Sequence, residues 1–266
     1  MGAKTLIIDG RQVSAEEGAT ILEALAANAH RHPGSPAMRH LTEGQSMADD
    51  WHVVTWAEYL LAAREIAGGL AELGVAPGQR VAVLSANRVE WHLADLGILL
   101  NGSITVPVYP TSSPSQVAYV LGDAETTVCF VDTHAQLGKV IAVRDQLPAL
   151  RHVVLTAGKR RTGDSFVVGF EALRRAGADR LRRHGDVVDE RTRGVKAGDI
   201  ATIVYTSGAS GTPKGVVLTH DNIMFALRNV TPVYAIAKGF LFSGASANRS
   251  QPALTPPTPP TSAQRR

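Results

Sequence analysis

The sequence predicts an α/β fold with largely parallel sheets flanked by helices. Apolar strand-like runs alternate with helical runs over most of the 266 residues, an order typical of parallel sheets. Hydrophobic residues make up 44% of the chain, which is enough for a substantial core. A run of small, hydroxyl-bearing residues around one lysine, 205–215, follows directly after an apolar strand. Open α/β sheets bind ligands at such strand ends.

The elements follow from local signals. Thr5–Val13 reads as a hairpin that turns at Asp9-Gly10 and precedes a helix. A helix is predicted over Trp56–Leu73, because Thr55 and Glu58 form a capping-box pair and Gly74 suits its end. The expected elements after it are strand Arg80–Leu84, helix Val89–Leu100, strand Ile104–Val108, a helix starting at Pro114 with Ser113 as N-cap, and strands Thr126–Val131, His152–Thr156 and Ile200–Tyr205.

Charge and cysteine content exclude several functions. A net charge of +3, from 27 basic and 24 acidic residues, is too balanced to indicate nucleic-acid binding. Arginines crowd between Arg144 and Arg193, which favours a solvated surface, with weak peripheral contact to anionic lipids as the alternative. The single cysteine, Cys129, lies in an apolar run and is expected to be a buried thiol.

No targeting or metal pattern stands out. Met1–Gly10 does not read as a signal peptide, and Leu93–Pro110 is too interrupted for a membrane span, so we expect a cytoplasmic protein. The nine histidines lack zinc-ligand spacing, and no metal-ligating residue is predicted.

The C-terminal stretch differs in composition. From about Ser243 the chain is rich in Ser, Pro and Thr, as in Thr255–Thr261. Such a composition cannot offset the entropy of ordering. We therefore expect a domain over 1–235 and a disordered tail over 236–266.

The run 205–215 suits a nucleoside triphosphate. Its glycines allow backbone N–H groups to approach phosphates, and its hydroxyls add donors. Lys214 supplies a compact positive charge and is the candidate catalytic residue. The predicted nucleotide-binding residues are Thr206, Ser207, Gly208, Ala209, Ser210, Gly211, Thr212, Pro213 and Lys214.

Rival motifs do not fit this run. A Walker A loop has Gly directly before its Lys and Ser or Thr directly after, whereas Pro213 and Gly215 stand there. A nucleophile elbow, G-x-S-x-G, fails because Gly211 follows Ser210 at once. A surface turn rich in small residues stays open as the simpler alternative.

Tyr205–Val216 closely resembles the phosphate-binding signature of the adenylate-forming (AMP-binding) enzymes, with departures at Ala209 and Ser210, where two threonines are common. Ile104–Leu121 is similar to a segment of bacterial long-chain fatty-acyl-CoA synthetases. The resemblance runs over residues 20 to 235 and indicates an incomplete N-terminal domain of such an enzyme.

The resemblance implies a two-step reaction. A fatty-acid carboxylate attacks ATP to give an acyl-adenylate and pyrophosphate, and the acyl group then passes to coenzyme A. The family also uses Mg²⁺, held by a Glu in a Tyr-Gly-x-Thr-Glu segment, an Asp for the ribose and a C-terminal Lys. Because none of these segments is found in the 266 residues, we expect a truncated or frameshifted member with little or no turnover.

Several alternatives stay open at this stage. The chain could be a non-catalytic ATP-binding fragment, a fatty-acyl-AMP ligase that loads a carrier protein, or an unrelated module with a convergent loop. Other site candidates are weaker. Tyr109, Thr111 and Ser112 are candidates for the nucleotide or acyl region, with strand-end packing as the alternative for Tyr109. His220 faces an acyl tunnel or simply begins a helix, and Trp91 reads as packing.

Overall fold

The computed structural model describes residues 5–8, 11–14, 20–41, 51–158, 164–184, 187–206 and 213–229. The predicted tail over 236–266 lies outside these residues, as do residues 207–212 of the predicted phosphate-binding run. The domain boundary at 235 therefore stays a prediction.

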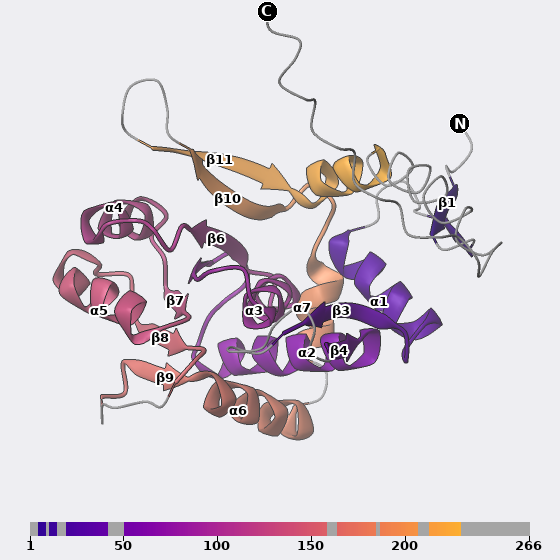
Figure 1. The fold of residues 1–266 in the computed structure, drawn as a ribbon, viewed down its shortest axis with the longest axis horizontal. Coiled ribbons are helices and arrows are strands. Elements are labelled where there is room, and N and C mark those ends of the chain that lie inside the picture. The colour runs from indigo at the N-terminus through magenta and orange to yellow at the C-terminus, as the bar shows by residue number, and fades with distance from the viewer. Residues whose placement is uncertain are drawn as a thin grey trace, which may run out of the picture.

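A seven-stranded sheet forms the centre of the fold (Figure 1). Its spatial order is β11-β10-β6-β5-β7-β8-β9, and every neighbouring pair is parallel except the antiparallel pair β10–β11. The predicted α/β class with a largely parallel sheet is thus confirmed. The strands are β5 (Arg80–Leu84), β6 (Ile104–Val108), β7 (Val128–Val131), β8 (His152–Leu155), β9 (Val167–Gly169), β10 (Ile200–Thr206) and β11 (Lys214–Thr219).

Helices cover both faces of this sheet. One face packs against α2 (Trp56–Glu72), α3 (Val89–Leu100) and α6 (Phe170–Arg183), and the other against α4 (Pro114–Asp123) and α5 (His134–Ala142). Strand β5 shows the division, because Val81 and Val83 belong to the α2–α3 core while Ala82 and Leu84 belong to the α4–α5 core. Side chains alternate along a strand, so a central strand must be apolar at every position.

The remaining elements are the hairpin β1 (Thr5–Ile8) and β2 (Arg11–Ser14), α1 (Ile21–Arg31), the antiparallel pair β3 (Pro36–His40) and β4 (His52–Thr55), the short 3₁₀ helix η1 (Arg144–Gln146), α7 (Val187–Gly194) and a helix over 220–229. Among them, α1, α7 and the pair β3–β4 lie beside α2, whereas η1 lies beside α4. The predicted N-terminal hairpin is confirmed by the pairing of β1 with β2. A third core joins α1, α2, α3 and α7.

The predicted helix starts are confirmed. The Thr55 side chain accepts from the Glu58 N–H, and the Glu58 carboxylate accepts from the Thr55 N–H. Ser113 caps α4 in the same way with Gln116, and Pro114 is the first helical residue. Both signals lie within four residues of the chain, which explains why the sequence was enough to locate them.

Helices α2 and α6 approach each other closely through glycines. A Cβ on Gly177 would lie 1.7 Å from the Glu65 carbonyl oxygen and 2.5 Å from the Gly69 nitrogen. A Cβ on Gly69 would likewise lie 2.5 Å from the Leu173 carbonyl oxygen. Backbone therefore meets backbone at this crossing, and no side chain larger than hydrogen fits.

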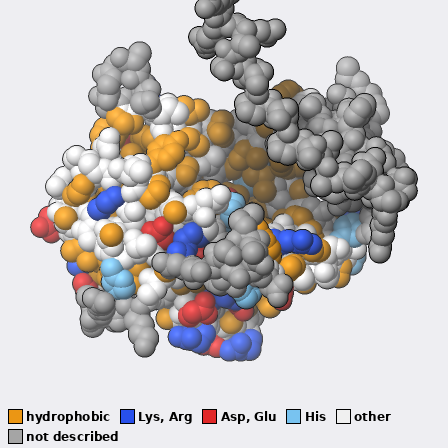
Figure 2. Space-filling view, in the orientation of Figure 1, with side chains coloured by type: hydrophobic (Ala, Val, Ile, Leu, Met, Phe, Trp, Pro, Cys, Tyr) orange, Lys and Arg blue, Asp and Glu red, His pale blue; other side chains and the backbone are white. Residues whose placement is uncertain are grey.

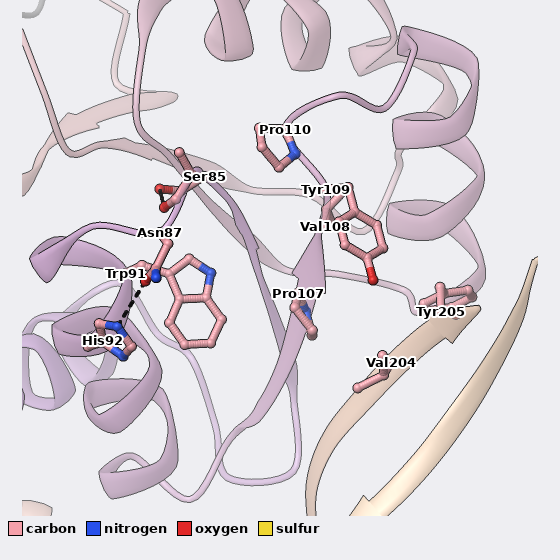
Figure 3. Close-up of a pocket in the computed structure, with 11 residues that line it drawn as sticks. Ser85, Asn87, Trp91, His92, Pro107, Val108, Tyr109, Pro110, Val204 and Tyr205 are labelled. Atoms are coloured by element: carbon pink, nitrogen blue, oxygen red, sulfur yellow. Dashed lines mark hydrogen bonds between the residues drawn. The ribbon is translucent and has the colours of Figure 1, made fainter. Parts of the chain in front are cut away.

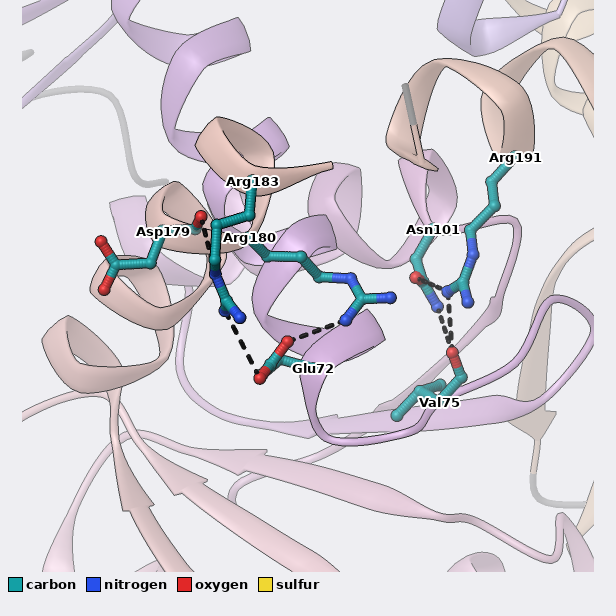
Figure 4. Close-up of polar contacts among 7 residues, drawn as sticks. All are labelled: Glu72, Val75, Asn101, Asp179, Arg180, Arg183 and Arg191. Atoms are coloured by element: carbon teal, nitrogen blue, oxygen red, sulfur yellow. Dashed lines mark hydrogen bonds and ion pairs between the residues drawn. The ribbon is translucent and has the colours of Figure 1, made fainter. Parts of the chain in front are cut away.

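Charged side chains fasten the same helices to each other (Figure 4). Glu72 at the end of α2 pairs with Arg180 at 2.8 Å and with Arg183 at 3.6 Å. Arg191 of α7 donates to the Val75 carbonyl oxygen at 2.8 Å and to the Asn101 side-chain oxygen. Part of the arginine-rich segment therefore links helices, in addition to forming the charged lower surface visible in Figure 2.

Cys129 lies in β7 and is fully buried, as predicted. Burial raises the pKa of its thiol to about 12, so the thiol stays protonated at neutral pH. Among the described residues, no helix is long and apolar enough to cross a bilayer.

Replacing Gly177 by Ala should strongly destabilise the domain. The new methyl group would force α2 and α6 apart, so we expect the free energy of unfolding to fall by about 3 kcal/mol. Gly138→Ala in α5 is the matched control, because nothing lies within 4 Å of its Cβ position. We expect the control to be neutral or stabilising by up to about 1 kcal/mol. Urea unfolding of the two variants measures both; similar stabilities would refute the close approach.

Asp95 of α3 gives the fold a pH dependence. Part of the residue reaches the surface, but its carboxyl group is desolvated, and this burial raises its pKa to about 6. In the unfolded chain the group ionises near pH 4. The contribution of Asp95 to the free energy of unfolding is therefore most favourable below that pH and is lost as the pH rises through 6.

Asp95→Asn should therefore become relatively more stable as the pH rises. Between pH 5 and pH 8 the difference in unfolding free energy between variant and parent should grow in favour of the variant by about 1 to 2 kcal/mol. Denaturation of both proteins at each pH tests this, because the titration of all other groups cancels in the difference. A pH-independent difference would mean that Asp95 titrates normally.

Candidate functional site

The site begins where β10 and β11 diverge. Thr206, the last residue of β10, lies directly opposite Lys214, the first residue of β11. Opposed residues of an antiparallel pair have Cα atoms about 5 Å apart. Two predicted site residues that are eight positions apart in sequence thus become neighbours. Residues Ser207 to Thr212 join them and lie outside the described residues, so their predicted contacts are untested.

This pair of strand ends lies at the ligand-binding edge of the sheet. Strand β10 runs parallel to β6, with Thr202 opposite Thr105, and β6 runs parallel to β5. The carboxyl ends of all three strands therefore face the same side. The predicted phosphate-binding run leaves the sheet at that edge, as the order of elements indicated.

A cleft of about 540 Å³ opens beside these strand ends (Figure 3). It lies between the start of α3 and the last residues of β6 and β10. None of the described residues that line it is Asp, Glu, Lys or Arg: they are Ser85, Ala86, Asn87, Trp91, His92, Pro107, Val108, Tyr109, Pro110, Val204 and Tyr205. Such an uncharged, aromatic-lined hollow suits an apolar group rather than a polyphosphate.

The floor of the cleft continues onto the hairpin. Val204 of β10 is paired with Val216 of β11, and cross-strand partners share a face of the sheet. Val216 is 44% exposed, so apolar surface extends from the cleft to the sheet edge. Apolar side chains gather in the upper part of Figure 2, where Figure 1 shows the hairpin.

His92 is the titratable histidine of the cleft. Its Nε2 lies 3.0 Å from the Asn87 side-chain oxygen, shown by the dashed line in Figure 3. Burial lowers the pKa of His92 below its usual value, so the ring is neutral at pH 7. Since the Asn87 oxygen can only accept, Nε2 carries the proton in this contact. The cleft therefore stays uncharged.

The weaker sequence candidates have different outcomes. Tyr109 lines the cleft and is 69% exposed, so the alternative that it packs at the strand end is wrong. Thr111 and Ser112 are not among the described residues that line the cleft. His220 begins the helix over 220–229 and is buried away from the cleft lining, which agrees with the helix-start alternative.

The structure also reveals contributions that sequence reasoning missed. Trp91 packs against the α2–α3 core, as predicted, and it also forms a wall of the cleft. Lys139 of α5 donates to the carbonyl oxygens of Pro110 and Ser112 at 2.7 and 2.8 Å, and Gln136 donates to the former at 3.0 Å. These bonds fix the segment that carries Tyr109. No sequence signal links α5 to this segment, because the partners are more than twenty residues apart.

Across the described parts of the chain, no three His, Cys, Asp or Glu side chains come together in a way that could hold a metal ion.

The model of the AMP-binding enzyme family matches residues 25–243, which is most of the chain. The chain belongs to the AMP-binding enzyme family. The resemblance inferred from Tyr205–Val216 is therefore confirmed.

Curated relatives of this AMP-binding protein are long-chain fatty-acid–CoA ligases. The Mycobacterium tuberculosis ligase FadD15 is 39% identical over 183 residues, which cover 67% of this chain and 28% of that protein. The rat ligase ACSBG1 is 32% identical over 185 residues, which cover 70% of this chain and 25% of that protein. The chain thus spans little more than a quarter of the length of these relatives.

Solved structures support the fold. A long-chain-fatty-acid–CoA ligase from Archaeoglobus fulgidus superposes with a TM-score of 0.64 at 20% identity, over 83% of this chain and 40% of that chain. A fatty acyl CoA synthetase from Mycobacterium tuberculosis gives a TM-score of 0.54 at 26% identity, over 76% and 34% respectively. The first likeness shows the fold alone.

Proposed function

We propose that this chain belongs to an enzyme that activates a fatty-acid carboxylate with ATP and then forms acyl-CoA. The observation that carries the proposal is the uncharged cleft directly beside the strand ends Thr206 and Lys214. An apolar chain and a polyphosphate need opposite surroundings, and here the two lie next to each other on one sheet edge. The names of the curated relatives support the same activity.

Each part of the site has a role in the proposed reaction. A carboxylate oxygen attacks the α-phosphorus of ATP and forms a new O–P bond, while the bond to the β-phosphate oxygen breaks and pyrophosphate leaves. Lys214 neutralises charge on the phosphates, and Thr206 to Thr212 supply hydroxyl and backbone donors around them. Positioning and charge neutralisation are the main requirements of such a displacement.

The acyl chain occupies the cleft in this proposal. Trp91, Pro107 and Val204 offer apolar contact area, while Tyr109 stands at the exposed rim. The thiol of coenzyme A then attacks the acyl carbonyl carbon and forms the thioester C–S bond, while the bond from that carbon to the AMP oxygen breaks and AMP and the thiol proton leave. Groups that the family uses for the second step are not found in the 266 residues, so we propose that these residues form acyl-CoA poorly or not at all, while the first step can be tested by itself.

Pyrophosphate exchange tests the first step on the purified chain. Labelled pyrophosphate should enter ATP only when a fatty acid is present, and Lys214→Ala should reduce the rate about a hundredfold or more, because a preorganised charge is lost. Lys196→Ala is the matched control, since Lys196 is an exposed lysine far from the hairpin loop and should leave the rate unchanged. Absence of exchange by folded protein would contradict catalysis by this chain.

A charge introduced into the cleft should weaken fatty-acid binding. Val204→Asp places a carboxylate on the cleft floor, where an apolar chain would have to desolvate it, so affinity should fall at least about tenfold. Val217→Asp is the control, because Val217 lies on the same hairpin but is paired with Ile203 on the other face. Displacement of a fluorescent fatty acid measures both variants. Equal losses would place the acyl chain elsewhere.

A further inference from the structure

Helix α4 contacts both ends of the hairpin loop. The Tyr119 hydroxyl donates to the carbonyl oxygen of Pro213 at 3.0 Å, immediately before Lys214. One turn later, the Asp123 carboxylate accepts the hydroxyl hydrogen of Tyr205, immediately before Thr206. One helix thus holds the chain where it enters the loop and where it leaves it.

The contact is reinforced by ring packing. Tyr119 and Tyr205 meet edge to face, with ring centroids 6.3 Å apart and an interplanar angle of 88°. Tyr205 lies opposite Gly215, and a Cβ on that glycine would come within 3.2 Å of the ring carbon that bears the hydroxyl. The glycine after Lys214 therefore leaves space for the tyrosine ring that reaches α4.

The protonation state of Tyr205 favours its hydrogen bond to Asp123. Burial, followed by the hydrogen bond to Asp123, raises the pKa of Tyr205 above its usual value. The hydroxyl consequently keeps its proton throughout the physiological range and can always donate to the carboxylate.

Nothing else among the described residues holds the Pro213 end so directly. Among the described strands, β11 lies at the edge of the sheet and pairs with β10 alone. Proline has no N–H, so Pro213 cannot donate to the ladder. Its carbonyl oxygen is bonded instead to a side chain 94 positions away. A bond of that range constrains the direction in which β11 leaves the loop.

We propose that Tyr119 and Asp123 form an α4 tether, a pair of positioning residues that hold Thr206 and Lys214 at the spacing needed to bind the ATP phosphates. The tether lies on the α4 face of the sheet, whereas the cleft floor lies on the α3 face. It does not touch the substrate, and it acts through the two strand ends. The inference rests on the proposed function for its ligand, but the geometry of the tether is independent of it.

Two variants remove the tether with little change in packing. Tyr119→Phe deletes only the hydroxyl, and Asp123→Ala deletes only the acceptor for Tyr205. Hydrogen exchange of the 206–215 peptide, followed by mass spectrometry, should rise severalfold in each variant, while exchange in α2 and β5 stays unchanged. Because a typical hydrogen bond is worth roughly a factor of five, the KM for ATP in pyrophosphate exchange should rise about fivefold in Tyr119→Phe and by at least as much in Asp123→Ala, whose acceptor is ionised, with kcat and the fatty-acid KM retained.

Two controls separate positioning from general stability. Asp123→Asn keeps an acceptor oxygen for Tyr205 and should restore the parent values. Tyr59→Phe removes a different tyrosine hydroxyl bonded to a backbone oxygen, that of His92, on the opposite face of the sheet. It should change neither the exchange of the 206–215 peptide nor the KM for ATP.

The outcomes are distinct. Unchanged hydrogen exchange of the peptide in both tether variants overturns the proposal, as does an increase spread evenly over the whole chain. Raised hydrogen exchange of the peptide with an unchanged KM for ATP, in a chain that catalyses pyrophosphate exchange, also overturns the proposal. If the parent chain shows no pyrophosphate exchange, the proposed function fails, whereas the hydrogen-exchange comparison still decides whether the tether holds the strand ends.

Discussion

Burial of β5 on both faces is the constraint on which the rest of the structure depends. Val81 and Val83 fill one core, while Ala82 and Leu84 fill the other. A slip of one residue against β6 would exchange these two sets, so the register is strongly fixed. The register in turn brings Leu84 opposite Val108. Ser85 and Tyr109 then follow at the same level, which is where the cleft opens.

Because side chains alternate along β10, the two faces of this strand make different contacts. Val204 faces α3 and extends the apolar floor, whereas Tyr205 faces α4 and reaches Asp123. Neighbouring residues of one strand thus border the cleft and contact α4 on opposite faces of the sheet. A single antiparallel partner, β11, completes both faces, with Val216 on one and Gly215 on the other.

Elements marked by local signals could be predicted from the sequence. Strands β5 and β6 and helix α3 have the predicted bounds, and the caps at Thr55 and Ser113 occur as expected. The predicted strand ends at Thr126 and Thr156 lie outside β7 and β8, because strand bounds depend on pairing. The pair β3–β4 and strand β9 were not predicted, since their partners decide whether they form strands at all.

For the site as well, local features could be predicted from the sequence and features built from distant segments could not. The run 205–215 could be singled out because its residues are consecutive, and its phosphate-binding role stays a prediction. The cleft could not be predicted, because it combines α3 and β6 with β10, which lies about a hundred positions later in the chain. Trp91 shows the difficulty: an apolar residue at helical spacing reads as core, and only the tertiary arrangement shows that it also borders a hollow. Tyr119 and Asp123 likewise gave no local signal beyond an ordinary amphipathic helix.

The strand that follows the hairpin loop has an electrostatic consequence. In a phosphate-binding loop that opens a helix, the aligned peptide dipoles add about half a positive charge at the anion. Here the residues after the loop form β11, and the helix over 220–229 begins only after that strand ends. A bound polyphosphate would therefore depend on discrete donors and on the exposed ammonium group of Lys214. Charges in water are screened within about 10 Å at 0.1 M salt, so nucleotide affinity at this edge should respond strongly to ionic strength.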